Sequence, residues 1–475
     1  MNRRDFLKTT IVSGAALSVG SCAALNNAKA KKKPNIIFIL TDDQRYDAMS
    51  CAGNRHAQTD NLDSLAARGV RFENAFVTLS ICSPSRAACL TGRYGSANGV
   101  TALSRKPWGR MHDSERTFAH ILKGAGYQTA MIGKWHLPNS PQSCGFDYVT
   151  YFKSNGPHRN RQVIERGVKK TAAGFIEDYN AARAIEFIEQ ASGNDAPFVL
   201  FLCTQLVHMD NNHDWVSKDE TFARYDPVKM PVPDTFDDDL QGRPPYLKTS
   251  RSRTKALEYG YDEKQNIQRH LAKYYAALED TDAAIGAVLN AVTEKGLDDN
   301  TYYIMMGDNG WLMGEHGLTS KVLAYEESIR VPMILAGPRI NRAVNDHLVV
   351  NIDLMPTILD MAEVPIPNNV HGKSLMPLLQ GQADNWRTSI LYECPRSSLG
   401  VKPHLAIRTD RYKYIQTYED ASLETVVFEE LYDLQNDPTE VKNLAQHHDH
   451  QQRKKTLIAK LKAHRDQPVT TLSMP

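Results

Sequence analysis

Several features that would define a class of protein are scarce in this sequence of 475 residues. Seven cysteines are too sparse, and odd in number, for a disulfide framework. The formal net charge is only +1, and residues 1–30 hold four of the 56 basic and one of the 55 acidic side chains, so the rest of the chain carries −2. This near-neutral balance gives no sign of nucleic-acid binding. No internal repeat is evident either, so the pattern does not indicate a repeat architecture.

Residues 1–30 have the pattern of an export leader. Arg3-Arg4 is followed by a short apolar stretch, residues 11–19, which is too short to span a bilayer as a stable helix. A twin-arginine address exports proteins that are already folded. The segment that ends at Cys22 resembles a lipoprotein cleavage site, although Gly20 departs from the usual pattern, and ordinary cleavage near Ala30 is the alternative. We therefore expect a protein of the periplasm or cell surface, with a lipid at Cys22 as one of two possibilities.

The rest of the chain divides by texture into two parts. Buried-type strands alternate with amphipathic helices over residues 31–384, which predicts an α/β domain with a large, mostly parallel sheet between helices. Periodicity fails between Met209 and about Gln265, so we expect a loop-rich insertion near the mouth of a site. Residues 385–475 are predicted to form a smaller α+β domain with an antiparallel sheet. Its strand candidates are Ser389–Tyr392, His404–Arg408, Tyr412–Gln416 and Val426–Tyr432.

Acidic and amide side chains follow two of the predicted strands. The apolar run Asn35–Leu40 leads to Asp42-Asp43, and the run Tyr302–Met306 leads to Asp308-Asn309. The carboxyl ends of parallel strands are where open α/β sheets place their chemistry. Adjacent carboxylates repel unless a cation neutralises them, and oxygen ligands suit Ca²⁺ or Mg²⁺ better than zinc. For Asp42-Asp43 taken alone, a solvated turn is the alternative.

Cationic and imidazole side chains follow the other strands. The strand Gln128–Ile132 leads to Lys134 and His136, which lie two residues apart and would face one pocket if the segment is extended. The strand Pro197–Leu202 leads to His208, and Lys321 lies in a loop. Together with Arg86, these groups suit a tetrahedral dianion or its monoester.

The run Cys82-Ser83-Pro84-Ser85-Arg86, which continues to Leu90-Thr91-Gly92-Arg93, is hard to explain by packing. Pro84 suits a helix start, but burial requires neither Cys82 nor Arg86; a small buried Cys at a helix N-terminus is the alternative. The run resembles the signature of the type I sulfatases, formylglycine-dependent enzymes of the alkaline-phosphatase-like superfamily. The resemblance extends over nearly the whole chain after the leader.

The resemblance implies a set of roles for the residues named above. It implies a Ca²⁺ site, with Mg²⁺ less favoured, formed by Asp42, Asp43, Asp308, Asn309 and Cys82 after its oxidation to formylglycine (3-oxoalanine). Arg86 and Lys134 would hold the formylglycine, and Lys134, His208 and Lys321 would bind the sulfate. One hydroxyl of the hydrated aldehyde would attack sulfur, with His208 as general acid aided by Lys321, and His136 would then deprotonate the second hydroxyl. A sulfatase-maturing enzyme is the implied partner.

The implied substrate is a sulfated polysaccharide or its oligosaccharides. A phosphonate monoester or phosphodiester hydrolase of the same superfamily is one alternative, and a non-catalytic sulfated-glycan-binding protein, which would need a lost nucleophile or ligand, is another. Polar loop residues considered for sugar contacts, each with an ordinary surface position as the alternative, are His56, Arg105, His158, His213, Arg243, His371 and His404.

Overall fold

Strand β1 (Asn35–Thr41) lies at the centre of a large sheet and is buried along its whole length. It pairs in parallel with β8 (Phe198–Cys203) on one side and with β9 (Thr301–Gly307) on the other. A strand that is covered on both faces needs apolar side chains throughout, which is why its continuous apolar run predicted it. The strand order is β13-β2-β12-β9-β1-β8-β4-β5-β6-β7. The remaining strands are β2 (Gly69–Phe72), β4 (Gln128–Lys134), β5 (Tyr148–Phe152), β6 (Arg159–Glu165), β7 (Val168–Phe175), β12 (Met333–Ala336) and β13 (Ala343–Asn345).

The computed structural model describes residues 32–103 and 107–465. The predicted leader, including Cys22, and Arg105 therefore lie outside the described residues. All the cysteines within those ranges are free thiols. None of the helices found there combines the length and the apolar character that crossing a bilayer would require.

The middle of the sheet is parallel, as predicted, and antiparallel pairs lie on either side of it. Strand β4 pairs in parallel with β5 and β8. Strand β12 runs antiparallel to β9 and β2, and β6 and β7 form an antiparallel hairpin beyond β5 that the sequence pattern did not predict.

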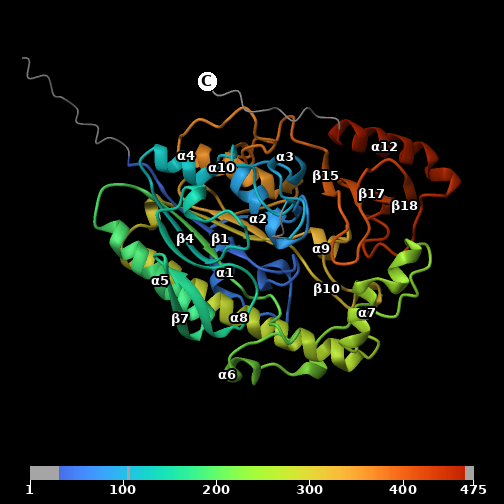
Figure 1. Cartoon of the computed structure of the whole chain (residues 1–475), viewed down its shortest axis with the longest axis horizontal. Helices are drawn as coiled ribbons and strands as arrows, with labels where there is room; N and C mark the ends of the chain where they lie inside the picture. The colour runs from blue at the N-terminus through green and yellow to red at the C-terminus, as the bar shows by residue number, and fades with distance from the viewer. Residues whose placement is uncertain (1–31, 104–106, 466–475) are drawn as a thin grey trace, which may run out of the picture. The chain divides into compact units, whose positions relative to one another are not determined.

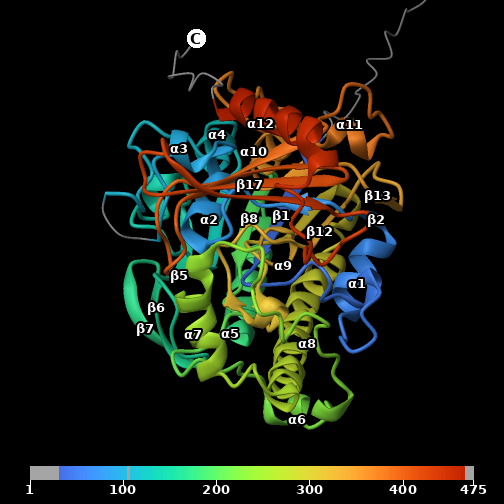
Figure 2. The ribbon, with the colours of Figure 1, turned by 90° about the vertical axis from the view of Figure 1, so that its right-hand side faces the viewer.

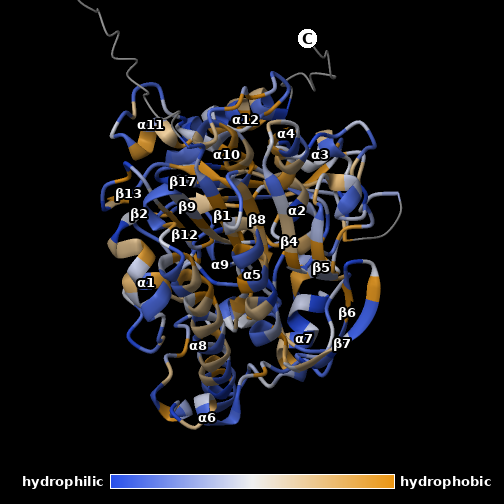
Figure 3. Cartoon of the chain, turned by 90° about the vertical axis from the view of Figure 1, so that its left-hand side faces the viewer, coloured by the Kyte–Doolittle hydropathy of each residue, from blue (hydrophilic) through white to orange (hydrophobic). Residues whose placement is uncertain are grey.

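Helices cover both faces of this sheet because alternate residues of its strands point to opposite sides. Ile36, Phe38 and Leu40 pack with α2, α4 and α10, whereas Ile37 and Ile39 pack with α1, α5 and α8. Figure 1 shows these two groups on opposite sides of the strands, and Figure 3 shows the hydrophobic residues concentrated in the strands. The helices are α1 (Asp60–Ala67), α2 (Cys82–Thr91), α4 (Phe118–Gly124), α5 (Ile176–Ser192), α8 (Lys264–Glu294), α10 (Leu354–Met361) and α11 (Met376–Leu379).

The predicted antiparallel sheet near the C-terminus is present. Its strands are β15 (Ser389–Cys394), β16 (His404–Thr409), β17 (Tyr412–Tyr418) and β18 (Val426–Asp433), in that order. Helix α12 (Gln451–Arg465) lies beside them, with Leu457 and Leu461 packed in one apolar cluster with Leu405 and Tyr414 (Figure 2). Lys413 of β17 forms an ion pair of 3.0 Å with Glu326 of α9 (Glu326–Ile329), outside the small sheet. Residues from Lys33 onward form one compact unit, so the boundary at residue 384 stays a prediction.

Short elements complete the fold. They are α3 (Gly95–Asn98), α6 (Asp219–Phe222), α7 (Arg251–Glu258), the parallel pair β3 (Ala75–Phe76) and β14 (Val349–Val350), and the antiparallel pair β10 (Leu312–Met313) and β11 (Thr319–Ser320). Helices α6 and α7 lie in the segment for which loops were predicted. Both are short, which is why periodicity did not reveal them.

Glu393 of β15 joins the small sheet to α3 and should make stability depend on pH. Burial raises the pKa of this carboxyl to about 7, although the Ser96 backbone N–H donates to it at 2.8 Å. The folded state then keeps a proton that the unfolded state releases near pH 4.5, so stability should fall as the pH rises from about 4.5 to 7. We expect Glu393→Gln, which keeps an acceptor for Ser96, to abolish this fall and to raise the free energy of unfolding at pH 8 by about 1–3 kcal/mol.

Urea unfolding at pH 5 and pH 8 measures this effect. The exposed Glu419→Gln serves as the matched control and should leave the pH dependence as in the wild type. An identical pH dependence in wild type and Glu393→Gln would contradict the assignment.

Candidate active site

Four neighbouring strands bring the predicted residues to one edge of the large sheet. Asp42 and Asp43 follow β1, Asp308 and Asn309 follow β9, Lys134 ends β4, and His208 lies five residues after β8. The four acidic and amide side chains are essentially inaccessible to solvent. The topology therefore makes one buried polar cluster out of segments that are far apart in the sequence.

Cys82 begins helix α2 and lies inside this cluster. Its Sγ is 3.2 Å from Lys321 Nζ, 3.6 Å from Lys134 Nζ and 3.7 Å from Asp42 Oδ1. Burial, and then the charge of Asp42, raise the pKa of the thiol to about 12 against the opposing effect of the lysines. The unmodified side chain is thus a protonated thiol and not a thiolate.

Arg86, one turn further along α2, holds two carboxylates together. Its guanidinium donates to Asp42 Oδ2 at 3.0 Å, to Asp308 Oδ2 at 2.7 Å and to the Lys134 carbonyl at 2.7 Å. Burial alone would raise the pKa of Asp42, but Lys134, His208 and Arg86 lower it well below its usual range. Asp42 is therefore ionised. The role of Arg86 is to hold Asp42, Asp308 and the Lys134 carbonyl in place by hydrogen bonds.

The oxygen atoms of the cluster fit a hard divalent cation. Asp43 Oδ2 and Asn309 Oδ1 are buried and have no hydrogen-bond partner among the described residues. Ligand atoms of Asp42, Asp43, Cys82 and His208 lie within 4.8 Å of one another. Burial raises the pKa of Asp43 against the opposing charge of Lys321, and the neighbouring Asp42 and Asp308 raise it further, so a bound cation would favour its ionised form. These donors suit Ca²⁺ or Mg²⁺.

His136 reaches the pocket by a route that the sequence argument described incorrectly. The segment is not extended there, because His136 has a φ of 57° in the left-handed region. Ser83 Oγ donates to the His136 carbonyl at 2.6 Å, which fixes the backbone beside Cys82. The ring lines the same pocket as Cys82, and its Nδ1 has no partner in the described part of the chain.

His208 is held by two neighbours. Its Nδ1 lies 2.6 Å from the Met209 carbonyl, so Nδ1–H donates there, and its Nε2 lies 2.9 Å from Asn155 Nδ2 and 3.6 Å from Asp43 Oδ2. Burial, followed by the charge of Lys134, lowers the pKa of the imidazole well below its usual range. Asn155 was not predicted from the sequence.

Lys321 bonds to Asp43 and is positioned by a loop that the small sheet supports. The next residue, Val322, donates its N–H to Ser80 Oγ at 3.2 Å. Its carbonyl accepts from Tyr392 Oη of β15 and lies 3.1 Å from His404 Nε2 of β16. His404 is thus a buried residue that supports this loop and not the sugar contact considered above.

The pocket above Cys82 has a volume of about 210 Å³, and part of its lining comes from the predicted insertion, as expected. His213 lines it. Arg243 is instead buried and donates to Asp238 and the Glu440 carbonyl, and the His371 ring lies tilted against Tyr94, away from this pocket. Lining residues that the sequence did not single out are Leu103, Asn155, Arg251, Lys255, Tyr259, Trp311 and Leu399. Their positions depend on loop packing, for which the chain carries no periodic signal.

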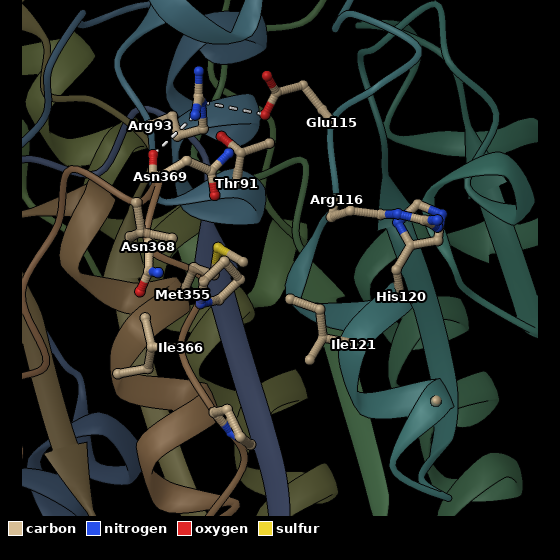
Figure 4. A pocket seen from close by; sticks show the side chains of 14 residues that line it. Thr91, Arg93, Glu115, Arg116, His120, Ile121, Met355, Ile366, Asn368 and Asn369 are labelled. Carbon is tan, nitrogen blue, oxygen red and sulfur yellow. Dashed lines mark hydrogen bonds and ion pairs between the residues drawn. The ribbon is translucent and has the colours of Figure 1, made fainter. Parts of the chain in front are cut away.

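A second cavity, of about 490 Å³, contains none of the predicted site residues. Its lining is largely apolar, with Ile121, Met355 and Ile366 facing it (Figure 4). Its charged end is an ion pair of 3.5 Å between Arg93 and Glu115. Arg116 and His120 also line this cavity, but among the described residues its lining contains neither a cysteine nor a group of carboxylates that could hold a cation, so we place the active site at Cys82.

Comparisons with known proteins agree with this placement. A family profile described as Sulfatase matches residues 34–364, and one described as N-sulphoglucosamine sulphohydrolase, C-terminal, matches residues 314–467. An N-acetylglucosamine-6-O-sulfatase of Bacteroides thetaiotaomicron is 30% identical to this chain. The alignment covers 92% of this chain and 87% of that sulfatase.

Solved structures extend the similarity to the fold. A structure described as being in complex with its substrate D-glucosamine-2-N,6-O-disulfate superposes with a TM-score of 0.83 at 28% identity, covering 93% of this chain and 100% of that one. A phosphonate monoester hydrolase from Silicibacter pomeroyi has a TM-score of 0.76 at 21% identity, covering 91% of this chain and 95% of that one, which shows the fold alone.

Together, the sheet, its helices and the buried site define a hydrolase of the alkaline-phosphatase-like superfamily. Within that superfamily the chain belongs to the sulfatase family, and it is a sulfuric ester hydrolase.

Proposed function

We propose that this enzyme removes sulfate from a sulfated carbohydrate, using a formylglycine formed from Cys82 and a bound Ca²⁺. The observation that carries the proposal is the position of Cys82, whose Sγ is buried within 3.2–3.7 Å of two lysines and an aspartate at the end of a pocket. The similarity to an N-acetylglucosamine-6-O-sulfatase over 92% of the chain supports a sugar as the alcohol part of the ester.

The site residues divide the work between binding and proton transfer. Formylglycine would supply a nucleophilic hydroxyl at residue 82, and a divalent cation held by Asp42, Asp43, Asp308 and Asn309 would neutralise charge on the sulfate oxygens. Lys134 and Lys321 both contact residue 82 and would stabilise the negative charge of the transition state.

The two histidines suit the two proton transfers. The Nδ1–H of His208 is engaged by the Met209 carbonyl, so Nε2 is the nitrogen that would protonate the departing sugar oxygen. In the neutral ring Nε2 carries no proton and accepts from Asn155 Nδ2, so it would first take up a proton, which the negative charge of a bound sulfate ester would favour. His136 has an unengaged Nδ1 in the same pocket as Cys82 and would take a proton from the residue 82 hydroxyl. Arg86 would act by holding Asp42 and Asp308 in place.

Aromatic side chains beside the pocket also favour a saccharide. The Trp311 ring lies 6.3 Å from the His208 ring, and Lys321 Nζ lies 5.5 Å from the Trp311 centroid. Tyr259 also lines the pocket. We further propose that the enzyme acts in the periplasm or at the cell surface after twin-arginine export, either with a lipid at Cys22 or after ordinary cleavage near Ala30, and that a sulfatase-maturing enzyme oxidises Cys82.

Sulfate release from a panel of substrates tests the proposal. We expect protein whose residue 82 has been confirmed as formylglycine by peptide mass to release sulfate from one class of sulfated oligosaccharide, measured by ion chromatography. The panel includes glycosaminoglycan, ulvan and carrageenan fragments and a small aryl sulfate. Turnover of a phosphonate monoester or phosphodiester, with no sulfate released from any member of the panel, would contradict the proposal.

A further inference from the structure

One cationic side chain lines the catalytic pocket without an assigned task. Arg251, the first residue of α7, lies on the pocket wall and is exposed. Its guanidinium forms no hydrogen bond or ion pair with any residue in the described ranges 32–103 and 107–465, whereas Arg86, Lys134 and Lys321 are all bonded to carboxylates. An arginine with its donors unengaged beside a sulfate-ester site is suited to bind a second oxyanion.

The packing of α7 fixes where this arginine lies. Ser252 donates its hydroxyl to the Thr319 carbonyl, and Arg253 donates to the Gly317 carbonyl at 2.7 Å. These contacts attach the helix to the segment that leads to Lys321. On another side, Gly400 lies so close that a Cβ there would meet the Cβ of Arg251 at 2.9 Å. The stem of Arg251 is therefore held at a set position relative to Lys321, while its guanidinium remains available.

The charged residues around Arg251 do not neutralise its positive charge. Lys255, one turn along α7, also lines the pocket but is paired with Glu258. Asp210 also lines the pocket, and its oxygens accept hydrogen bonds from Asn212 N at 2.8 Å, Asp214 N at 3.1 Å and Asn212 Nδ2 at 3.1 Å. The Asp210 carboxylate is thus hydrogen-bonded within its own loop, and the pocket lining beside α7 keeps the positive charge of Arg251.

We propose that Arg251 determines specificity by binding a second acidic group, a sulfate or a carboxylate, of the saccharide whose sulfate ester is cleaved at residue 82. The inference rests on the proposed function, and it narrows the substrate to a saccharide with at least two negative charges. Such a residue adds binding energy for the correct substrate and none for a small aryl sulfate, which does not extend to the rim.

The test compares Arg251→Gln with the wild type on substrates that differ only in the second charge. These are the saccharide found to release sulfate, its analogue with that one sulfate only, its analogue with a carboxylate in place of the second sulfate, and an aryl sulfate. We expect kcat/KM to fall about tenfold or more on the doubly charged saccharides and to change less than about twofold on the other two. Arg251→Lys should restore part of the loss, and added NaCl should reduce the wild-type preference. The ratio of the wild-type kcat/KM values on the disulfate and on its carboxylate analogue shows which of the two groups Arg251 prefers.

The matched control is Lys248→Gln, which removes an exposed positive charge three residues earlier and outside the pocket. It should leave every kcat/KM unchanged. An equal loss on all substrates, or a wild type that shows no preference for the second charge, would overturn the assignment of Arg251. If the wild type cleaves the aryl sulfate and no saccharide, the proposed function itself fails, and the inference fails with it.

Discussion

Cys82→Ala should release no measurable sulfate, a loss of about 10⁴-fold or more, while folding as the wild type does. The reason is positional: Cys82 starts α2 at the point where Asp42, Lys134 and Lys321 converge, within 3.7 Å of Sγ. The variant lacks the side chain from which the nucleophile is made, but it retains those neighbours. Sulfate release and thermal unfolding of the two proteins provide the measurement, and the variant should still bind the substrate.

Cys89→Ala is the matched control for this experiment. Cys89 lies in the same helix and is equally buried, but its side chain packs in the apolar core. Its substitution should cost about 1 kcal/mol of stability and leave sulfate release within about twofold of the wild type. Sulfate release by Cys82→Ala at the rate of the Cys89→Ala control would refute the role of residue 82.

Removal of the bound cation is expected to reduce sulfate release by about 10³-fold or more, and addition of Ca²⁺ to restore it. Removal of the cation would leave the buried Asp43 Oδ2 and Asn309 Oδ1 without an interaction partner, since neither has a hydrogen-bond partner in the described chain. Asp43→Ala should show the same loss in the presence of excess Ca²⁺. Binding also has a readout that is independent of activity: Ca²⁺ should raise the Tm of chelator-treated wild type, and should not raise that of Asp43→Ala.

Asp47→Asn tests whether loss of any nearby carboxylate has this effect. Asp47 lies four residues further along the chain, pairs with Arg45 at 2.8 Å and is 39% exposed. Its variant should keep the response to Ca²⁺. Full activity of protein shown by elemental analysis to be free of metal would contradict the cation site.

Much of the fold could be predicted because its elements repeat simple patterns. Strands that are buried on both faces, such as β1 and β9, are continuous apolar runs, and β15–β18 are short strands separated by turn residues. The β6–β7 hairpin was missed because its outer face is polar and exposed, so that segment has the composition of a loop. Edge strands of this kind are defined by their partner strand more than by their own residues.

The same distinction applies to the site. The polar residues just after β1 and β9 could be predicted, because strand ends of a parallel sheet meet at one edge. The route of His136 into the pocket could not, because a left-handed φ at a non-glycine residue leaves no signal in composition. Arg243 and His404 are residue types that often bind ligands, but in this fold they contact other protein groups and support the structure. Arg251 was missed for the opposite reason, since only the packing of α7 shows that it lines the pocket.

The support that β15 and β16 give to the carbonyl of Val322 limits how this enzyme can be shortened. Residues 31–384 include every group predicted to touch the sulfate or the cation, so a fragment of these residues would contain the whole predicted site. Such a fragment would lack Tyr392 and His404, and the loop that carries Lys321 would lose its outer support. Protein engineers who need a smaller enzyme, or a fusion partner, should therefore leave the small sheet intact and join new sequence beyond α12.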